Sequence, residues 1–306
     1  MKLGFIFPGQ GCQHPGMGKE IYDRFESVKK VYTDASDLCG TDIADVSFGR
    51  SSRMLKQSSH AQICILTMSL AINQVLFELG IRPHVMAGHS LGEYSALIGS
   101  GAVDFREGLG LVKKRGKLMV ESCSENPGSM AAVTGLSYES LAALCMESPY
   151  PVWPANMNTQ EQIVVSGTKE GIRHIMKRAG ECRGKAIQLP VAGAFHSPLM
   201  KNAATLFSFA VQEVPVHSPN CPIIGNTDAQ VKTTPEAIVH EMKTQMLSPV
   251  MWFSTIERMK QMGVTTFVEV GPNKVLKGLL IKMDRSARVF STGSLRELEQ
   301  VIKAEA

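Results

Sequence analysis

The stretch that decides the fold of this chain is His84-Val85-Met86-Ala87-Gly88-His89-Ser90-Leu91-Gly92-Glu93-Tyr94. Residues 84–87 favour a short strand, and Glu93–Ile98 has the pattern of a helix. Between them, residues 88–92 match the G-x-S-x-G pattern of a nucleophile elbow, the tight turn that joins a strand to a helix. In this context the pattern predicts an α/β fold with Ser90 at the turn.

The glycines of this turn have a steric reason. A strand-to-helix turn this sharp leaves no room for side chains beside the serine. The turn lifts the Ser90 hydroxyl out of the sheet and directs the first amides of the helix at a reacting carbonyl group. The alternative is a glycine-flanked helix start that the serine only caps. The strand before the pattern and the helix after it favour a nucleophile.

Strands and helices alternate through much of the chain. Leu3–Phe7 predicts a strand, and Ala61–Leu79 predicts a helix that stops at Gly80. Beyond residue 197 we expect a strand near Ile223–Asn226, a helix to Met246, a helix Val250–Met262, a strand Thr265–Val270 and a helix Lys274–Met283. Such alternation implies a parallel sheet covered on both faces. We therefore predict an α/β-hydrolase-like parallel-sheet core.

A different pattern occupies residues 128–192. The expected elements are a strand Met130–Thr134, a helix Ser137–Met146, strands Pro151–Ala155 and Gln162–Ser166, a helix Thr168–Ala179 and a strand Lys185–Leu189. The order β-α-β-β-α-β is that of ferredoxin-like units. We predict a small ferredoxin-like α+β domain at 128–192, inserted into a large catalytic domain made of residues 1–127 and 193–306.

The composition is that of a soluble globular enzyme. The 306 residues are 44% hydrophobic, and a net charge of +4 without a basic stripe argues against nucleic-acid binding. The longest apolar stretch, Ile63–Ile81, is interrupted by Asn73 and Glu78, so we expect a core helix and no membrane span. Leu3–Phe7 is too short for the apolar region of a signal peptide.

The cysteines indicate a reducing compartment. There are 7 of them, with no CxxC pair, and His and Cys never cluster at the spacing of metal ligands. We therefore expect free thiols, no bound metal and a cytoplasmic location.

A serine nucleophile needs a general base within hydrogen-bond reach. His89 adjoins Ser90 in sequence, but successive side chains at such a turn point in different directions. His196 follows the last strand of the predicted small domain and precedes a Ser-Pro helix start, on the exposed rim where functional residues collect. Position alone therefore makes His196 only a candidate for the base, and the alternative, a solvated loop histidine, stays open at this point.

Arg115 is the most informative single residue. Its helical neighbours three and four positions away are all apolar: Leu111, Val112, Leu118 and Met119. A buried guanidinium is costly unless an anion pairs with it. The anion could be a carboxylate of the protein or the carboxylate of a substrate, which a planar guanidinium can hold with two parallel hydrogen bonds.

The loop Pro8-Gly9-Gln10-Gly11 follows the first predicted strand. It is not a phosphate-binding P-loop, because no Gly-Lys-Ser/Thr follows it. It is either a tight turn or a loop whose backbone or Gln10 amide donates hydrogen bonds to a ligand.

Taken together, these segments resemble the malonyl-CoA:acyl carrier protein transacylases and the related acyltransferases of polyketide synthases. The likeness runs from about residue 3 to 285, with the motifs in the family's order. The matching segments are Phe7-Pro8-Gly9-Gln10-Gly11, Gly88-His89-Ser90-Leu91-Gly92-Glu93-Tyr94, Lys114-Arg115-Gly116-Lys117, Phe195-His196-Ser197 and Glu269-Val270-Gly271-Pro272.

The resemblance implies a role for each matching residue. Ser90 would be the acylated nucleophile, His196 its base and later acid, and Arg115 the ligand of the free malonyl carboxylate. Gln10 and the Leu91 backbone amide would form the oxyanion hole.

Two further roles follow from the same resemblance. In this family the carbonyl of a glutamine near a Pro-Val pair orients the histidine, and here that residue is Gln245. The last carbonyls of a helix lack internal partners, so they can accept the imidazole N–H. Phe195 resembles the malonyl-selective pattern. Departures such as Cys12, where the family usually has serine, leave open whether the pathway is that of fatty acids or of polyketides.

The implied reaction transfers a malonyl group from malonyl-CoA to the phosphopantetheine thiol of an acyl carrier protein, by a ping-pong mechanism through a Ser90 ester. No cofactor is expected, because the coenzyme A thioester is a substrate. We expect a monomer that binds neither nucleic acid nor membrane. Three alternatives remain: an acyl hydrolase without a carboxylate-binding arginine, an esterase whose histidine is oriented by Asp or Glu, and a non-catalytic carrier-protein scaffold.

Overall fold

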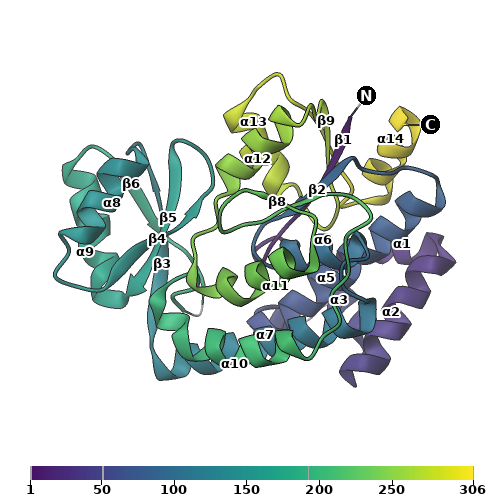
Figure 1. Cartoon of the computed structure of the whole chain (residues 1–306), viewed down its shortest axis with the longest axis horizontal. Helices are drawn as coiled ribbons and strands as arrows, with labels where there is room; N and C mark the ends of the chain where they lie inside the picture. Colours follow the sequence, from purple (N-terminus) through teal and green to yellow (C-terminus); the bar gives the residue numbers. More distant parts are fainter. Residues whose placement is uncertain (1, 50–51, 192, 306) are drawn as a thin grey trace.

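The computed structural model describes residues 2–49, 52–191 and 193–305, and it shows two β-sheets, each with its own helices (Figure 1). Residues 1, 192 and 306, which end the predicted domains, lie outside the described residues. The predicted boundaries between the domains therefore stay predictions.

The larger sheet has six strands in the order β10-β9-β1-β2-β7-β8. Its strands are β1 (Leu3–Phe7), β2 (Val85–Gly88), β7 (Ile223–Ile224), β8 (Val231–Lys232), β9 (Thr266–Glu269) and β10 (Arg288–Ser291). All neighbours pair in parallel except β7 and β8, which form an antiparallel hairpin. The predicted parallel-sheet core is confirmed. The sequence analysis missed β8 and β10; β8 has only two residues, too few to show a period, and β10 is a partly exposed strand at the end of the sheet.

Helices cover both faces of this sheet. Because successive side chains of a strand point to opposite faces, Phe5 and Phe7 of β1 join one hydrophobic cluster and Ile6 joins the other. The first cluster contains α1 (Lys19–Arg24), α2 (Glu26–Cys39), α3 (Ile43–Phe48), α4 (Ser52–Leu55), α5 (Ser58–Glu78), α6 (Leu91–Gly99), α7 (Phe105–Glu125), α10 (Lys201–Gln212), α11 (Pro235–Thr244) and α14 (Leu295–Glu305). The second contains α12 (Trp252–Gln261) and α13 (Val275–Met283).

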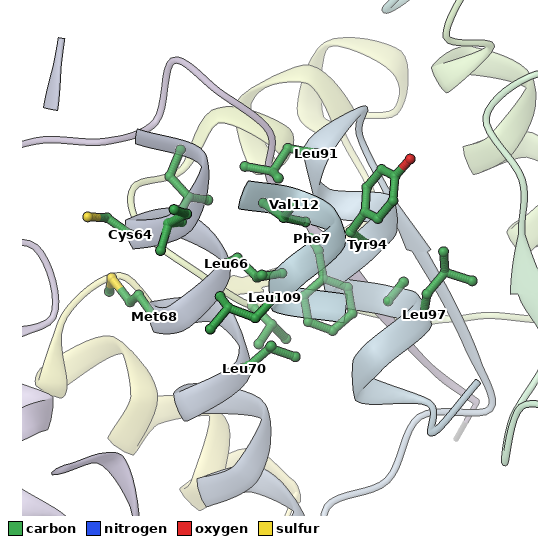
Figure 2. Packing of buried hydrophobic residues seen from close by; sticks show 14 of the residues in the cluster. Phe7, Cys64, Leu66, Met68, Leu70, Leu91, Tyr94, Leu97, Leu109 and Val112 are labelled. Atoms are coloured by element: carbon green, nitrogen blue, oxygen red, sulfur yellow. The ribbon is translucent and has the colours of Figure 1, made fainter. Parts of the chain in front are cut away.

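Helix α5 lies at the centre of the first cluster. In Figure 2, Leu66 and Leu70 of α5 are seen with Phe7 of β1 and Leu109 of α7 in the same cluster. By length and composition α5 could cross a membrane, but 83% of its most apolar window is buried inside the protein. Burying each leucine contributes about 1.5–3 kcal/mol. Its apolar character is thus explained by the core, as the sequence analysis expected.

The smaller sheet is antiparallel, with the order β4-β5-β3-β6. Its elements follow the chain order β3 (Gly128–Thr134), α8 (Tyr138–Met146), β4 (Val152–Met157), β5 (Gln162–Thr168), α9 (Lys169–Glu181) and β6 (Lys185–Gln188). Both helices pack on the sheet and close a separate hydrophobic cluster. This is the β-α-β-β-α-β connectivity of ferredoxin-like units.

The two sheets are joined through Val250. Its amide donates to the carbonyl of Ala155 at 2.8 Å, and its carbonyl accepts from the amide of Met157 at 2.8 Å, so Val250 extends β4 by one bridge. Val250 lies between α12 and a short 3-10 helix, Gln245–Leu247. The edge strand of the small sheet therefore holds the segment that contains Gln245 and Ser248.

Candidate active site

Ser90 lies at the turn between β2 and α6 with a φ of 52°, a left-handed conformation that is strained for any residue but glycine. A Cβ atom on Gly88 would lie 1.9 Å from the carbonyl carbon of Gly92, and one on Gly92 would lie 2.0 Å from the carbonyl oxygen of Phe7. Only glycine fits at either position. The steric reason given for the G-x-S-x-G pattern therefore holds in the structure.

His196 is the histidine beside Ser90. Its Nε2 lies 2.7 Å from Ser90 Oγ, and its Nδ1 lies 3.0 Å from the carbonyl oxygen of Gln245 and 3.2 Å from that of Ser248. A carbonyl can only accept a hydrogen bond, so the proton of neutral His196 belongs on Nδ1. Nε2 is then left with a lone pair that can take the Ser90 proton. The alternative of a solvated loop histidine is wrong, because His196 is buried.

His89 points away from the nucleophile. Its Nε2 lies 2.9 Å from Asn158 Oδ1 in the small-sheet region, and its ring packs edge-on against Trp252. His89, although adjacent to Ser90 in sequence, thus connects the regions of the two sheets and does not contact the nucleophile.

Arg115 is only 1% exposed and reaches the same centre. Its Nη2 donates to Ser90 Oγ at 3.1 Å and to Gln245 Oε1 at 3.0 Å, and its Nη1 donates to Gln62 Oε1 at 2.8 Å. Its Nε has no partner, and within the described residues Arg115 makes no ion pair. No carboxylate of the described residues therefore pairs with Arg115, as the first alternative requires, and the guanidinium charge faces the nucleophile.

Burial, and next the nearby Arg115 charge, lower the pKa of His196 to about 3. Below its folded pKa a histidine would be protonated and could not act as a base. At neutral pH His196 is therefore neutral, and its Nε2 lone pair is available to take a proton.

We expect acylation of Ser90 by malonyl-CoA, the substrate that the resemblance implies, to keep its rate from neutral pH down to about pH 5, where an ordinary imidazole, with a pKa of about 6.5, is mostly protonated. Single-turnover formation of the acyl adduct, followed by intact mass across this range, measures it. Returning the acid-treated enzyme to neutral pH controls for denaturation. A loss of rate with its midpoint near the ordinary imidazole value would contradict the expectation.

The predicted oxyanion hole lies beside the elbow. Leu91 is the first residue of α6, where amides have no acceptor within the helix. A Cβ atom on Gly9 would lie 2.5 Å from the carbonyl oxygen of His89, so the Pro8–Gly11 loop lies against the turn. Gln10 Nε2 donates to Ser58 Oγ at 2.9 Å, which fixes the loop to α5. The roles of Gln10 and Leu91 stay predictions.

Phe195 precedes the base and is 6% exposed, packed in the first cluster. Its part in substrate selectivity also stays a prediction. Among residues 2–49, 52–191 and 193–305, no group of three His, Cys, Asp or Glu side chains could hold a metal ion.

The sequence analysis gave no role to Asn226, which holds the elbow. Its Oδ1 accepts from the Ser90 amide at 2.7 Å, and its Nδ2 donates to the Gly88 carbonyl at 2.6 Å. Asn226 follows β7, and β7 pairs in parallel with β2. The carboxyl ends of neighbouring parallel strands meet at one edge of a sheet, which is the signal that could have identified it.

A strained serine, a neutral histidine oriented by carbonyl groups and a buried cation are the parts of a site that passes an acyl group through a serine ester. The fold and this site define an enzyme of the acyltransferase class. The chain belongs to the acyl transferase domain family, whose profile matches residues 4–297.

Individual relatives narrow the class. The malonyl CoA-acyl carrier protein transacylase of Bacillus subtilis (strain 168) is 37% identical, over 99% of this chain and 96% of its own length. The crystal structure of the enzyme of that name from Clostridium perfringens ATCC 13124 is 36% identical, with a TM-score of 0.95 over 99% of this chain and 97% of its own. A malonyl-transacylase solved in complex with its type II polyketide synthase acyl carrier protein is 32% identical, with a TM-score of 0.96 over 99% of this chain and 100% of its own.

Proposed function

We propose that this enzyme transfers a malonyl group from malonyl-CoA to the phosphopantetheine thiol of an acyl carrier protein through a Ser90 ester, in fatty acid or polyketide biosynthesis. The observation that carries the proposal is the buried Arg115 guanidinium, 3.1 Å from Ser90 Oγ and without a carboxylate partner in the described chain. The names of the relatives agree with it.

The first half-reaction follows from the hydrogen bonds. Ser90 Oγ attacks the thioester carbonyl while its proton passes to His196 Nε2, 2.7 Å away. We propose that the Leu91 amide and Gln10 stabilise the oxyanion; a single such donor contributes about 2.7–4 kcal/mol. When the C–S bond breaks, His196 returns its proton to the departing thiolate of coenzyme A. The cation that forms on His196 in between is stabilised by the carbonyl groups of Gln245 and Ser248.

The second half-reaction reverses the roles. His196 takes the proton of the carrier-protein thiol, the thiolate attacks the Ser90 ester, and Ser90 recovers its proton. Coenzyme A leaves before the carrier-protein thiol reacts with the Ser90 ester, which is ping-pong chemistry, and the same base serves both halves. The Ser90 amide is held by Asn226, so the nucleophile keeps its place while the acyl carrier changes.

Arg115 selects the acyl group. The free carboxylate of a malonyl ester lies one methylene group beyond the ester carbonyl, which is within reach of a guanidinium that already contacts Ser90 Oγ. Two parallel hydrogen bonds from the guanidinium would hold it and fix the orientation of the carbonyl. An acetyl ester leaves the buried charge unpaired.

The remaining expectations are proposals of the same kind. The partners are malonyl-CoA and an acyl carrier protein; we propose a cytoplasmic monomer that needs no cofactor and binds neither nucleic acid nor membrane. The alternatives fit less well. An acyl hydrolase has no use for Arg115, and in an esterase a carboxylate would orient the histidine, whereas here the carbonyls of Gln245 and Ser248 do so.

Intact mass spectrometry tests the proposal directly. Incubation with malonyl-CoA should give a malonyl adduct that a holo acyl carrier protein removes and that water removes far more slowly. Rapid hydrolysis of the adduct would favour an acyl hydrolase, and the absence of any adduct would favour a non-catalytic scaffold.

The Arg115→Ala variant should lose malonyl transfer by about 10- to 100-fold, since hydrogen bonds to a charged group contribute about 1.5–3 kcal/mol, while acetyl transfer holds or rises. The ratio of malonyl to acetyl adduct formation measures this. Arg115→Lys, which keeps the charge and loses the planar fork, is the matched variant and should fall between. A lower melting temperature together with an unchanged ratio would make Arg115 a structural residue.

A further inference from the structure

Behind the elbow lies Glu93, a buried carboxyl group that the proposed mechanism does not use. It is 1% exposed, and it lies in α6 one turn after the nucleophile. We propose that Glu93 is a positioning residue for acyl transfer, whose two carboxyl oxygens hold the nucleophile through Asn226 and the base through Gln245. The inference concerns the activity of Ser90 and rests on the proposed function only for the choice of substrate.

Each carboxyl oxygen of Glu93 begins a chain of hydrogen bonds, called an arm below, and the first arm leads to the nucleophile. Glu93 Oε1 accepts from the backbone amide of Asn226 at 2.8 Å. The side chain of Asn226 in turn bonds both the amide of Ser90 and the carbonyl of Gly88, at 2.7 and 2.6 Å. Because Ser90 has a strained φ of 52°, its backbone needs such restraint from outside the turn.

The second arm runs to the base and the cation. Glu93 Oε2 accepts from Gln245 Nε2 at 2.5 Å, and that nitrogen also donates to the Ser90 carbonyl at 2.9 Å. The Oε1 atom of Gln245 accepts from Arg115, and the backbone carbonyl of Gln245 accepts from His196 Nδ1. Gln245 therefore contacts Ser90, His196 and Arg115, and Glu93 fixes which end of the Gln245 amide faces Arg115.

A second buried carboxyl group, that of Glu241, lies next to Glu93. Glu241, 1% exposed, hydrogen-bonds Glu93, and it also accepts from the amide and hydroxyl of Thr227 at 2.9 and 2.8 Å. Lys232 Nζ lies 3.3 Å from Glu241 and balances its charge. Burial, and next the charge of Glu241, raise the pKa of Glu93 well above its usual value.

The test uses the full chain and two readouts. The Glu93→Ala variant releases both arms, and we expect kcat for malonyl transfer to fall about 100-fold with KM changed less than about threefold, because displacing reacting groups by about 1 Å costs that much. Labelling of Ser90 by a fluorophosphonate, which needs an activated serine and no malonyl carboxylate, should slow by a similar factor. Glu93→Gln keeps one acceptor oxygen and the shape, so it should lose about 10-fold.

Glu269→Gln is the matched control. Glu269 is also a fully buried carboxyl group that accepts from two backbone amides, those of Leu276 and Lys277, but it caps α13 and contacts neither the nucleophile nor the base. We expect it to lower the melting temperature and leave the labelling rate of Ser90 within about twofold of wild type, since sites without shared partners act independently.

The outcomes separate the two claims. The positioning role is overturned if Ser90 is labelled in both Glu93 variants as fast as in the wild type. It is also overturned if their labelling rate falls no more than that of a Glu269→Gln variant with the same melting temperature. If the wild type labels rapidly and yields no malonyl adduct, the proposed function fails while the role of Glu93 is still measured by labelling. If Glu93→Ala does not fold, the labelling rate of Glu93→Gln decides alone.

Discussion

The Ser90→Ala variant should form no acyl adduct with malonyl-CoA and should fold as the wild type does. The substitution removes only the hydroxyl, which bonds His196 and Arg115 and contributes nothing to the core. Alanine keeps the Cβ atom that the strained turn already accommodates. Loss of a serine nucleophile typically costs on the order of 10⁶ in kcat, so the adduct should fall below detection by intact mass.

Binding provides the control for this variant. The Arg115 guanidinium is still present in Ser90→Ala, so malonyl-CoA should still bind, as calorimetry can measure, while acetyl-CoA binds more weakly. An adduct formed undiminished in Ser90→Ala would place the nucleophile elsewhere and overturn the site as a whole.

The His196→Ala variant should acylate about 10²–10⁴ times more slowly than the wild type, which is the usual contribution of a positioned general base. Without the imidazole, Ser90 Oγ keeps only its bond to Arg115, which can stabilise an alkoxide but cannot take a proton. Both half-reactions should slow, because one base serves both. Single-turnover acylation, followed by release to a holo acyl carrier protein, measures each half.

His89→Ala is the matched control, since both histidines are neighbours of the nucleophile, one in sequence and one in space. His89 bonds Asn158 and not Ser90, so its loss should affect stability more than the rate of acylation. A larger loss of rate in His89→Ala than in His196→Ala would show that His196 is not the base.

Much of the fold could be predicted because it depends on local patterns. The period of Leu3–Phe7 and of Ala61–Leu79, and the glycines around Ser90, predicted strands, a core helix and the elbow close to their observed bounds. The inner face of α7 was also readable, since the neighbours three and four positions from Arg115 are all apolar, and Arg115 is buried. The sequence analysis missed elements of every length: β8 has two residues, too few for any period to show, but α2 with 14 residues and α14 with 11 were also not predicted.

The site was less accessible to sequence reasoning. The burial of Arg115 could be predicted, but its partners Gln62 and Gln245 lie on α5 and on a 3-10 helix far away in the chain. Gln245 entered only through a resemblance, and its backbone carbonyl indeed faces His196. Glu93 lies inside the matching segment Gly88–Tyr94, yet nothing in the local sequence distinguishes a buried glutamate that holds several site residues from a solvated helix residue.

The sequence by itself determined what depends on steric and periodic rules over a few residues: a serine on a turn that only glycine can flank, and a cation on the apolar face of a helix. Tertiary structure alone decided which histidine serves that serine and what holds both. Ser90 and His196 are 106 positions apart, and Gln245, which touches both, is 155 positions from Ser90. Hydrogen bonds of 2.5–3.2 Å depend on the packing of the whole core, and no local pattern encodes that packing.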